Sequence, residues 1–167
     1  MATIYKVLPD PLAPELILDG SVAEQLLGES VIHLSPDKSF QGKVSEVKEW
    51  KQFYRVGSNA FAISEQAWVH CMEMYYVITE NDLELLSVQA GGNAFRVIHP
   101  RDVLPPSDDP SKICDMRYIG CLFRIESRPH QDIYCYEGMA VPDNEFKHCY
   151  DKHGFTGLLF EEVWTDD

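Results

Sequence analysis

An internal repeat is the feature of this sequence that most limits the folds open to it. The segment Phe61–Cys71 (FAISEQAWVHC) aligns without gaps on Met139–Cys149 (MAVPDNEFKHC), and alanine, histidine and cysteine coincide. Each copy is typical of a strand followed by a capped helix. A β-type run follows each copy, at Glu84–Val88 and at Leu158–Trp164. Because such a repeat indicates duplicated structural units, we expect two related strand–helix–strand units.

Apolar periodicity predicts two helices inside these units. Ser64 is a good N-cap for a helix over Ser64–Met74, in which apolar residues recur at spacings of three and four. Pro142 opens the second helix, Pro142–His153, and Gly154 follows it at the C-cap position. A shorter helix is predicted at Ser21–Leu27 from its capping box.

Short β-type runs, rich in residues that favour strands, predict the strands of a sheet. They lie at Ile4–Leu8, Glu15–Leu18, Val31–Leu34, Ala60–Ile63, Leu83–Val88, Ala94–His99, Cys121–Glu126, Ile133–Glu137 and Leu158–Trp164. We therefore predict the α+β class, with one domain over residues 1–167. Its units, 58–104 and 113–165, share an antiparallel or mixed sheet on which the helices pack.

Two polar segments are predicted to be loops. Ser35–Asn59 has no sustained periodicity before Trp50, and Pro105–Lys112 is a turn-rich break between the two halves. The run Gly91-Gly92-Asn93 lacks the lysine and hydroxyl residue of a phosphate-binding loop, so it indicates a hairpin turn.

Acidity excludes some classes of partner. The chain has 27 acidic and 14 basic residues, a net charge of -13, spread evenly between residues 1–99 and 100–167. Such a surface repels nucleic acid and anionic membranes. The start lacks the pattern of a secretion signal, and no apolar run has the roughly 20 residues that span a bilayer. With five cysteines and no CxxC pair, these features predict a cytoplasmic protein with reduced thiols.

Residues suited to catalysis or metal binding are few. His70, Cys71, His148 and Cys149 together offer two nitrogens and two sulfurs to a zinc ion. Adjacent residues on a helix point about 100° apart, however, so a His-Cys dipeptide is poorly placed to chelate one ion. We expect the cysteines in the core, the histidines at its edge, and neither a metal nor another cofactor.

The C-terminal part contains four short motifs: CLFRI at Cys121–Ile125, YCYEG at Tyr134–Gly138, VPDNEF at Val141–Phe146 and GFTGLLF at Gly154–Phe160, followed by Glu161-Glu162-Val163. These motifs resemble those of a bacterial immunity-protein family of polymorphic toxin systems, immunity family eleven. The resemblance covers residues 58–165, and its most distinctive part is the Thr-Gly-Leu-x-Phe ending at Phe160. The chain departs from the family at Cys121–Phe123, where a proline-containing lead-in is usual, and at Pro142, where serine is more common.

The resemblance implies a non-enzymatic protein that binds and neutralises a cognate toxin inside the producing cell. The acidity of the chain favours a basic toxin, for example a nuclease. No contact residues follow from the family, so we select acidic residues near aromatic residues or in loops: Glu80, Asp82, Asp108, Asp109, Glu161 and Glu162. The alternatives are a small metal-dependent hydrolase that uses the His-Cys pairs, and a homo-oligomeric adaptor, for example a homodimer.

Overall fold

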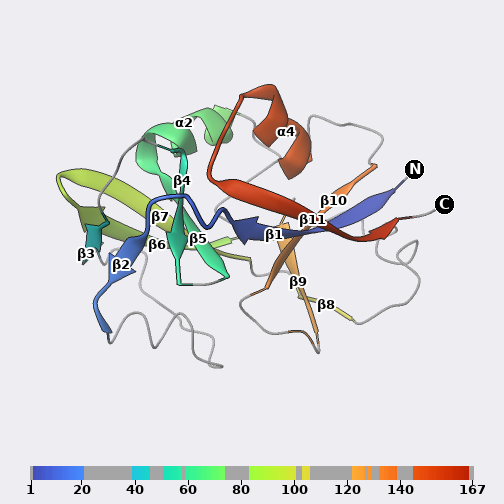
Figure 1. The fold of residues 1–167 in the computed structure, drawn as a ribbon, viewed down its shortest axis with the longest axis horizontal. Helices are drawn as coiled ribbons and strands as arrows, with labels where there is room; N and C mark the ends of the chain where they lie inside the picture. The colour runs from blue at the N-terminus through green and yellow to red at the C-terminus, as the bar shows by residue number, and fades with distance from the viewer. Residues whose placement is uncertain are drawn as a thin grey trace.

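The computed structural model describes eleven strands and two helices (Figure 1). The described residues are 2–20, 39–45, 51–57, 59–73, 83–100, 103–105, 122–126, 128, 132–138 and 145–165. Strands account for about 60 % of them and helices for 14 %. The predicted α+β class is therefore wrong, and the fold is mostly β. The two sheets bury most of the apolar residues in the core. The two helices cover only part of that core.

The first sheet is nearly closed into a barrel. Its strand order is β2 (Leu16–Leu18), β3 (Ser39–Val44), β6 (Leu83–Ala90), β7 (Asn93–Pro100), β5 (Ala60–Ser64) and β4 (Phe53–Val56). Only the β3–β6 pair is parallel among the described pairs of this sheet. A parallel bridge between Glu15 and Arg55 joins the two ends of the sheet, and the Arg55 N–H donates to the Pro14 carbonyl at 2.8 Å.

Apolar side chains fill the interior of this barrel. Because side chains alternate along a strand, β5 directs Ala60 and Ala62 inward and Phe61 and Ile63 outward. Small residues on β5 leave room for larger ones from the other strands. The buried members of the interior cluster are Leu16, Leu18, Tyr54, Val56, Ala62, Leu86, Val88, Ala90, Phe95 and Val97.

The second sheet has five strands and holds both ends of the described chain. Its order is β11 (Leu158–Thr165), β1 (Thr3–Pro9), β10 (Ile133–Glu137), β9 (Leu122–Ile125) and β8 (Val103–Leu104). β8 runs parallel to β9, and the other pairs are antiparallel. The N-terminal strand therefore lies beside the C-terminal strand (Figure 1).

The largest core cluster joins the outer side of the barrel to the second sheet and both helices. Phe53 on β4 is fully buried there. Its ring lies 5.7–6.1 Å, centroid to centroid, from those of Phe61, Phe146, Tyr150 and Phe155. Aromatic residues from four separate segments thus hold the two halves of the chain together.

Both helices are short. α2 (Glu65–Glu73) begins after Ser64, whose Oγ accepts the Ala67 N–H at 3.3 Å, as the predicted cap requires. α4 (Phe146–Lys152) begins four residues after the predicted Pro142, with Glu145 at the N-cap. Gly154 has a φ of 63°, which agrees with its predicted C-cap role. Within the described residues, neither helix has the length and apolar character needed to cross a membrane.

The two strand–helix–strand units do not share one sheet, contrary to the prediction. β5, α2 and β6 belong to the barrel, whereas β10, α4 and β11 belong to the second sheet. The units nevertheless have the same connection. β5 and β6 both pair with β7, and β10 and β11 both pair with β1. In each unit, therefore, the helix connects two strands that are separated by one antiparallel strand.

The predicted loop Ser35–Asn59 contains two strands, β3 and β4, and this prediction was wrong. β3 is polar in sequence, and it is a strand because it pairs with β2 on one side and β6 on the other. The predicted Gly91–Gly92 turn is confirmed: both glycines have positive φ, 57° and 77°, and Ala90 pairs with Asn93. The predicted helix Ser21–Leu27 and strand Val31–Leu34 lie outside the described residues.

Candidate binding surface

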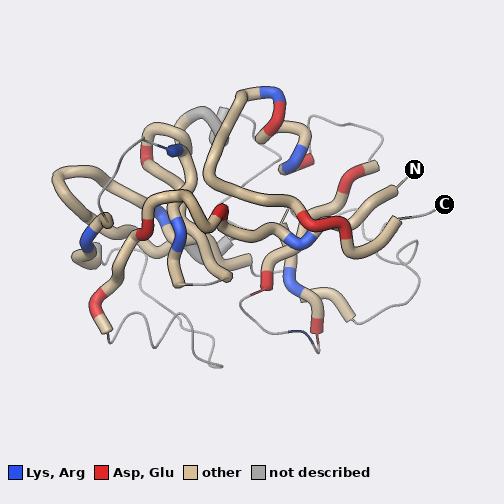
Figure 2. Tube along the Cα trace, in the orientation of Figure 1, with Lys and Arg blue, Asp and Glu red and all other residues tan. Residues whose placement is uncertain are grey.

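The outer edge of the second sheet carries two of the predicted contact residues. Glu161 and Glu162 lie in the middle of β11, and both are exposed. β11 pairs with β1, and no other strand of the described chain pairs with it. Figure 2 shows this acidic segment on β11. Because neighbouring strand residues face opposite sides, exposure of both shows that β11 is open on both faces here.

The two glutamates have different neighbours on β1. Glu161 lies opposite Lys6, and Glu162 lies opposite Tyr5. The Lys6 ammonium is 3.2 Å from Asp132, so it already has an acidic partner. Among the described residues, neither glutamate forms an ion pair.

A β-bulge ends the regular part of this edge. Tyr5 pairs with Glu162 and Ile4 pairs with Trp164, so Val163 is the extra residue. Bulges twist a strand and limit unspecific edge-to-edge pairing. Val163 and Leu159 are 44 % and 46 % exposed, which places one aliphatic side chain on each side of the acidic pair.

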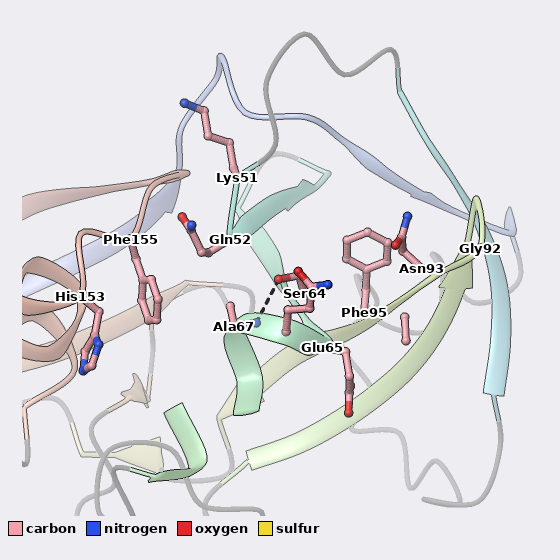
Figure 3. A pocket seen from close by; sticks show the side chains of 12 residues that line it. Lys51, Gln52, Ser64, Glu65, Ala67, Gly92, Asn93, Phe95, His153 and Phe155 are labelled. Atoms are coloured by element: carbon pink, nitrogen blue, oxygen red, sulfur yellow. Dashed lines mark hydrogen bonds between the residues drawn. The ribbon is translucent and has the colours of Figure 1, made fainter. Parts of the chain in front are cut away.

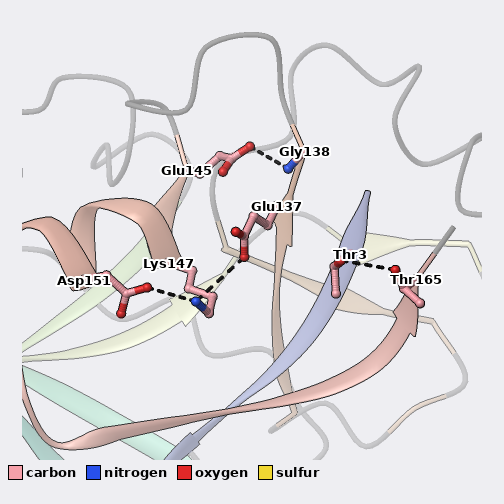
Figure 4. A network of polar contacts seen from close by, with 7 residues as sticks. All are labelled: Thr3, Glu137, Gly138, Glu145, Lys147, Asp151 and Thr165. Atoms are coloured by element: carbon pink, nitrogen blue, oxygen red, sulfur yellow. Dashed lines mark hydrogen bonds and ion pairs between the residues drawn. The ribbon is translucent and has the colours of Figure 1, made fainter. Parts of the chain in front are cut away.

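A charged network lies beside this edge, on the face that α4 covers (Figure 4). The Lys147 ammonium is 2.9 Å from Asp151 and 3.8 Å from Glu137. It also lies 5.3 Å from the ring centre of Tyr5 and 5.6 Å from that of Phe160. Lys147 thus joins α4 to β1, β10 and β11 and holds the edge strand in position.

Burial and neighbouring charges shift the pKa values of both Lys147 and Tyr5. Burial lowers the pKa of Lys147, but the hydrogen bond and charge of Asp151 and the charge of Glu137 outweigh it, so the pKa is raised. Burial and the charge of Glu137 raise the pKa of Tyr5. At neutral pH these shifts keep Lys147 charged and Tyr5 neutral, so a cationic ammonium lies next to an uncharged aromatic ring.

Glu145 is the N-cap residue of α4, but its side chain forms a hydrogen bond outside the helix. Its side chain is 3 % exposed, and its Oε1 accepts the Gly138 N–H at 2.7 Å. The N-cap side chain makes no hydrogen bond to its own helix. Instead, it ties the end of β10 to the beginning of α4 (Figure 4).

The other predicted contact residues lie outside the described part of the chain. They are Glu80, Asp82, Asp108 and Asp109. The structure therefore places two of the six predicted residues, Glu161 and Glu162, on one edge strand with their side chains on opposite faces.

A cleft of about 760 Å³ lies at the beginning of α2 (Figure 3). Ser64, Asn93 and Phe95 line it from the barrel, Glu65 lines it from α2, and His153 and Phe155 line it from the segment after α4. Its polar groups serve the fold. Glu65 pairs with Arg96 at 2.9 Å, and Gln52, also in the lining, accepts hydrogen bonds from the N–H and hydroxyl of Thr156.

The metal-binding alternative gains no geometric support from the described residues. Cys149 is 2 % exposed and belongs to the core, and His148 beside it is half-buried, as expected. His70 and Cys71 lie on α2, but their side chains are outside the description. Within the described part of the chain, no three His, Cys, Asp or Glu residues are grouped so as to hold a metal ion.

Sequence reasoning missed the residues that support the edge. Lys147 and Asp151 have the i, i+4 spacing of a helical ion pair, which is a usable signal. The contacts of Lys147 with Tyr5 and Glu137 join distant segments, so no local pattern indicates them.

In comparisons with known proteins, no family model matches this chain, and no curated protein is significantly similar to it.

Proposed function

We propose that this chain is an immunity protein, which binds a cognate bacterial toxin and neutralises it in the cytoplasm of the producing cell. The motifs between Cys121 and Val163 support this proposal through their resemblance to such a family. The structural observation that supports it best is the exposed pair Glu161 and Glu162 on an edge strand, between exposed Leu159 and Val163. The proposed function depends on a protein–protein interface with the toxin and requires no catalytic residue.

The charge of this surface favours a basic toxin domain. Two adjacent carboxylates without an ion pair in the described structure offer sites for lysine or arginine, and the net charge of -13 attracts such a partner over a distance. Complementary charge speeds the encounter and disfavours acidic competitors. Association should therefore slow as ionic strength rises.

The surroundings of β11 suit it to tight binding. β1 pairs with β11 from Pro9 to Thr3, and Lys147 fixes the aromatic residues beneath it. A surface that is already ordered loses little conformational entropy on binding. Exposed Leu159 and Val163 add apolar area next to the charges.

If a reading frame next to this gene ends in a toxin-like domain, co-expression with that domain tests the function. We expect the chain to restore growth and to co-purify with a catalytically inactive form of that domain. A toxin domain from an unrelated system is the control, and it should remain toxic. Arrested growth, together with separation of the two proteins on a column at low salt, would overturn the proposal.

A further inference from the structure

We infer that the outer edge of β11 accepts an extended, lysine- or arginine-bearing segment of the partner as an additional strand of the second sheet. This inference rests on the proposed function and specifies how the partner binds. It joins two observations: β11 is an unpaired edge among the described strands, and Glu161 and Glu162 lie at its centre.

The backbone of β11 provides the first part of the argument. On one side, its backbone forms the ladder with β1 from Leu158 to Thr165. On the other side, the described residues supply no strand. An edge of this kind presents a row of N–H and C=O groups that an extended segment can pair with.

The bulge opposite Ile4 and Tyr5 limits regular pairing to the first half of the strand. Leu159, Glu161 and Glu162 are exposed, whereas Leu158 is buried at the beginning of the strand. The bulge at Val163 interrupts the regular pleat after Glu162. The added strand should therefore pair between Leu159 and Glu162.

The charges identify the occupant. Alternate residues of an added strand lie on opposite faces of the sheet, so basic side chains on either face meet Glu161 or Glu162. A second copy of this chain is disfavoured by the same residues. In a two-fold-symmetric antiparallel pair of two β11 strands centred on these residues, Glu161 would lie opposite Glu161 of the other copy, or Glu162 opposite Glu162, and like charges directly opposite are destabilising.

Short peptides and the full-length, isotope-labelled chain test the inference without the toxin. The probe is a capped peptide of alternating lysine and valine, and its match is the same peptide with every backbone nitrogen methylated, so that neither edge can donate a ladder hydrogen bond. We expect the unmodified peptide to slow amide hydrogen exchange along β11 by about tenfold or more at millimolar concentration, since new ladder hydrogen bonds protect the amides. The methylated peptide keeps the charge but should give no protection.

Charge variants complete the test. Glu161→Gln with Glu162→Gln should weaken peptide binding by about tenfold, and reversal of both to lysine should abolish it. Gln66 on α2 is also exposed, and Gln66→Lys is the matched control that should leave binding unchanged.

Three results would overturn the inference. They are equal binding of the methylated peptide, no protection of β11 at saturating peptide, and β11 protection by self-association without peptide. The peptide experiments contain no toxin, so none of these three results decides whether the chain restores growth. The growth-rescue experiment therefore remains a separate test of the proposed function.

Discussion

The Lys6 ammonium lies 3.2 Å from the carboxylate of Asp132, whose side chain is only 6 % exposed. Asp132 also accepts a hydrogen bond from the Asn59 amide at 3.1 Å. The pair links β1 to the residue before β10 and to the β4–β5 turn. Asp132 is therefore a buried charge that depends on two distant partners.

Removal of either charge of this pair should destabilise the fold. We expect Asp132→Ala to lower the free energy of unfolding by about 2–3 kcal/mol, because it deprives both Lys6 and Asn59 of a partner. Lys6→Met keeps the side-chain stem but leaves the buried Asp132 carboxylate without its counter-charge, so it should cost a similar amount, about 2–3 kcal/mol. In urea denaturation, the double variant should cost less than the sum of the two single changes. Strict additivity would contradict the described contact.

Gly157 is expected to tolerate no side chain. Its φ is 111°, and an added Cβ would overlap the Phe53 carbonyl oxygen. Gly157→Ala should therefore cost about 3 kcal/mol or more in thermal or urea unfolding, because both the backbone and its neighbour must move. Gly154→Ala is the control. With a φ of 63° and no atom within 4 Å of the added Cβ, it should cost about 1 kcal/mol.

Stability should fall at alkaline pH through Tyr54, which is fully buried in the barrel interior. Burial raises its pKa from the ordinary tyrosine value of about 10 to about 12. The folded state therefore holds this proton more tightly than the unfolded state. The resulting stability is complete below pH 10 and is lost as the pH rises from about 10 to about 12. Unfolding followed by urea titration at each pH checks this.

Tyr54→Phe should flatten this part of the pH profile. Tyr134 and Tyr150 also have pKa values that are raised, chiefly by burial, so some alkaline sensitivity should remain. An unchanged profile in Tyr54→Phe would contradict the assignment to Tyr54.

Trp68 should contribute through its volume more than through its indole N–H. Its side chain is 1 % exposed, and its Nε1 has no hydrogen-bond partner in the described structure. Trp68→Ala should cost about 3–5 kcal/mol in urea denaturation. Trp68→Phe leaves a smaller cavity and removes the buried unsatisfied donor, so it should cost less than half as much. Similar costs for both changes would show that the indole N–H has a partner.

The sequence by itself determined the local structure of most described strands. β1, β2, β5, β6, β7, β9, β10 and β11 lie where short β-type runs predicted them, and the Gly91–Gly92 turn and α2 agree too. Such a run is a local property of the sequence, which is present whatever the strand pairs with. Glu161 and Glu162 are exposed, and their role as contact residues stays a prediction.

Only the tertiary structure decided which strands pair and therefore the fold class. β3 is polar and was not predicted, since its place depends on β2 and β6, which lie on either side of it. The repeat predicted two similar units but not their separation into two sheets, because a strand's own sequence does not specify its neighbour. The edge position of β11 depends on pairing with β1, more than 140 residues away in the chain. Such contacts are set by the packing of distant segments, which no local pattern contains.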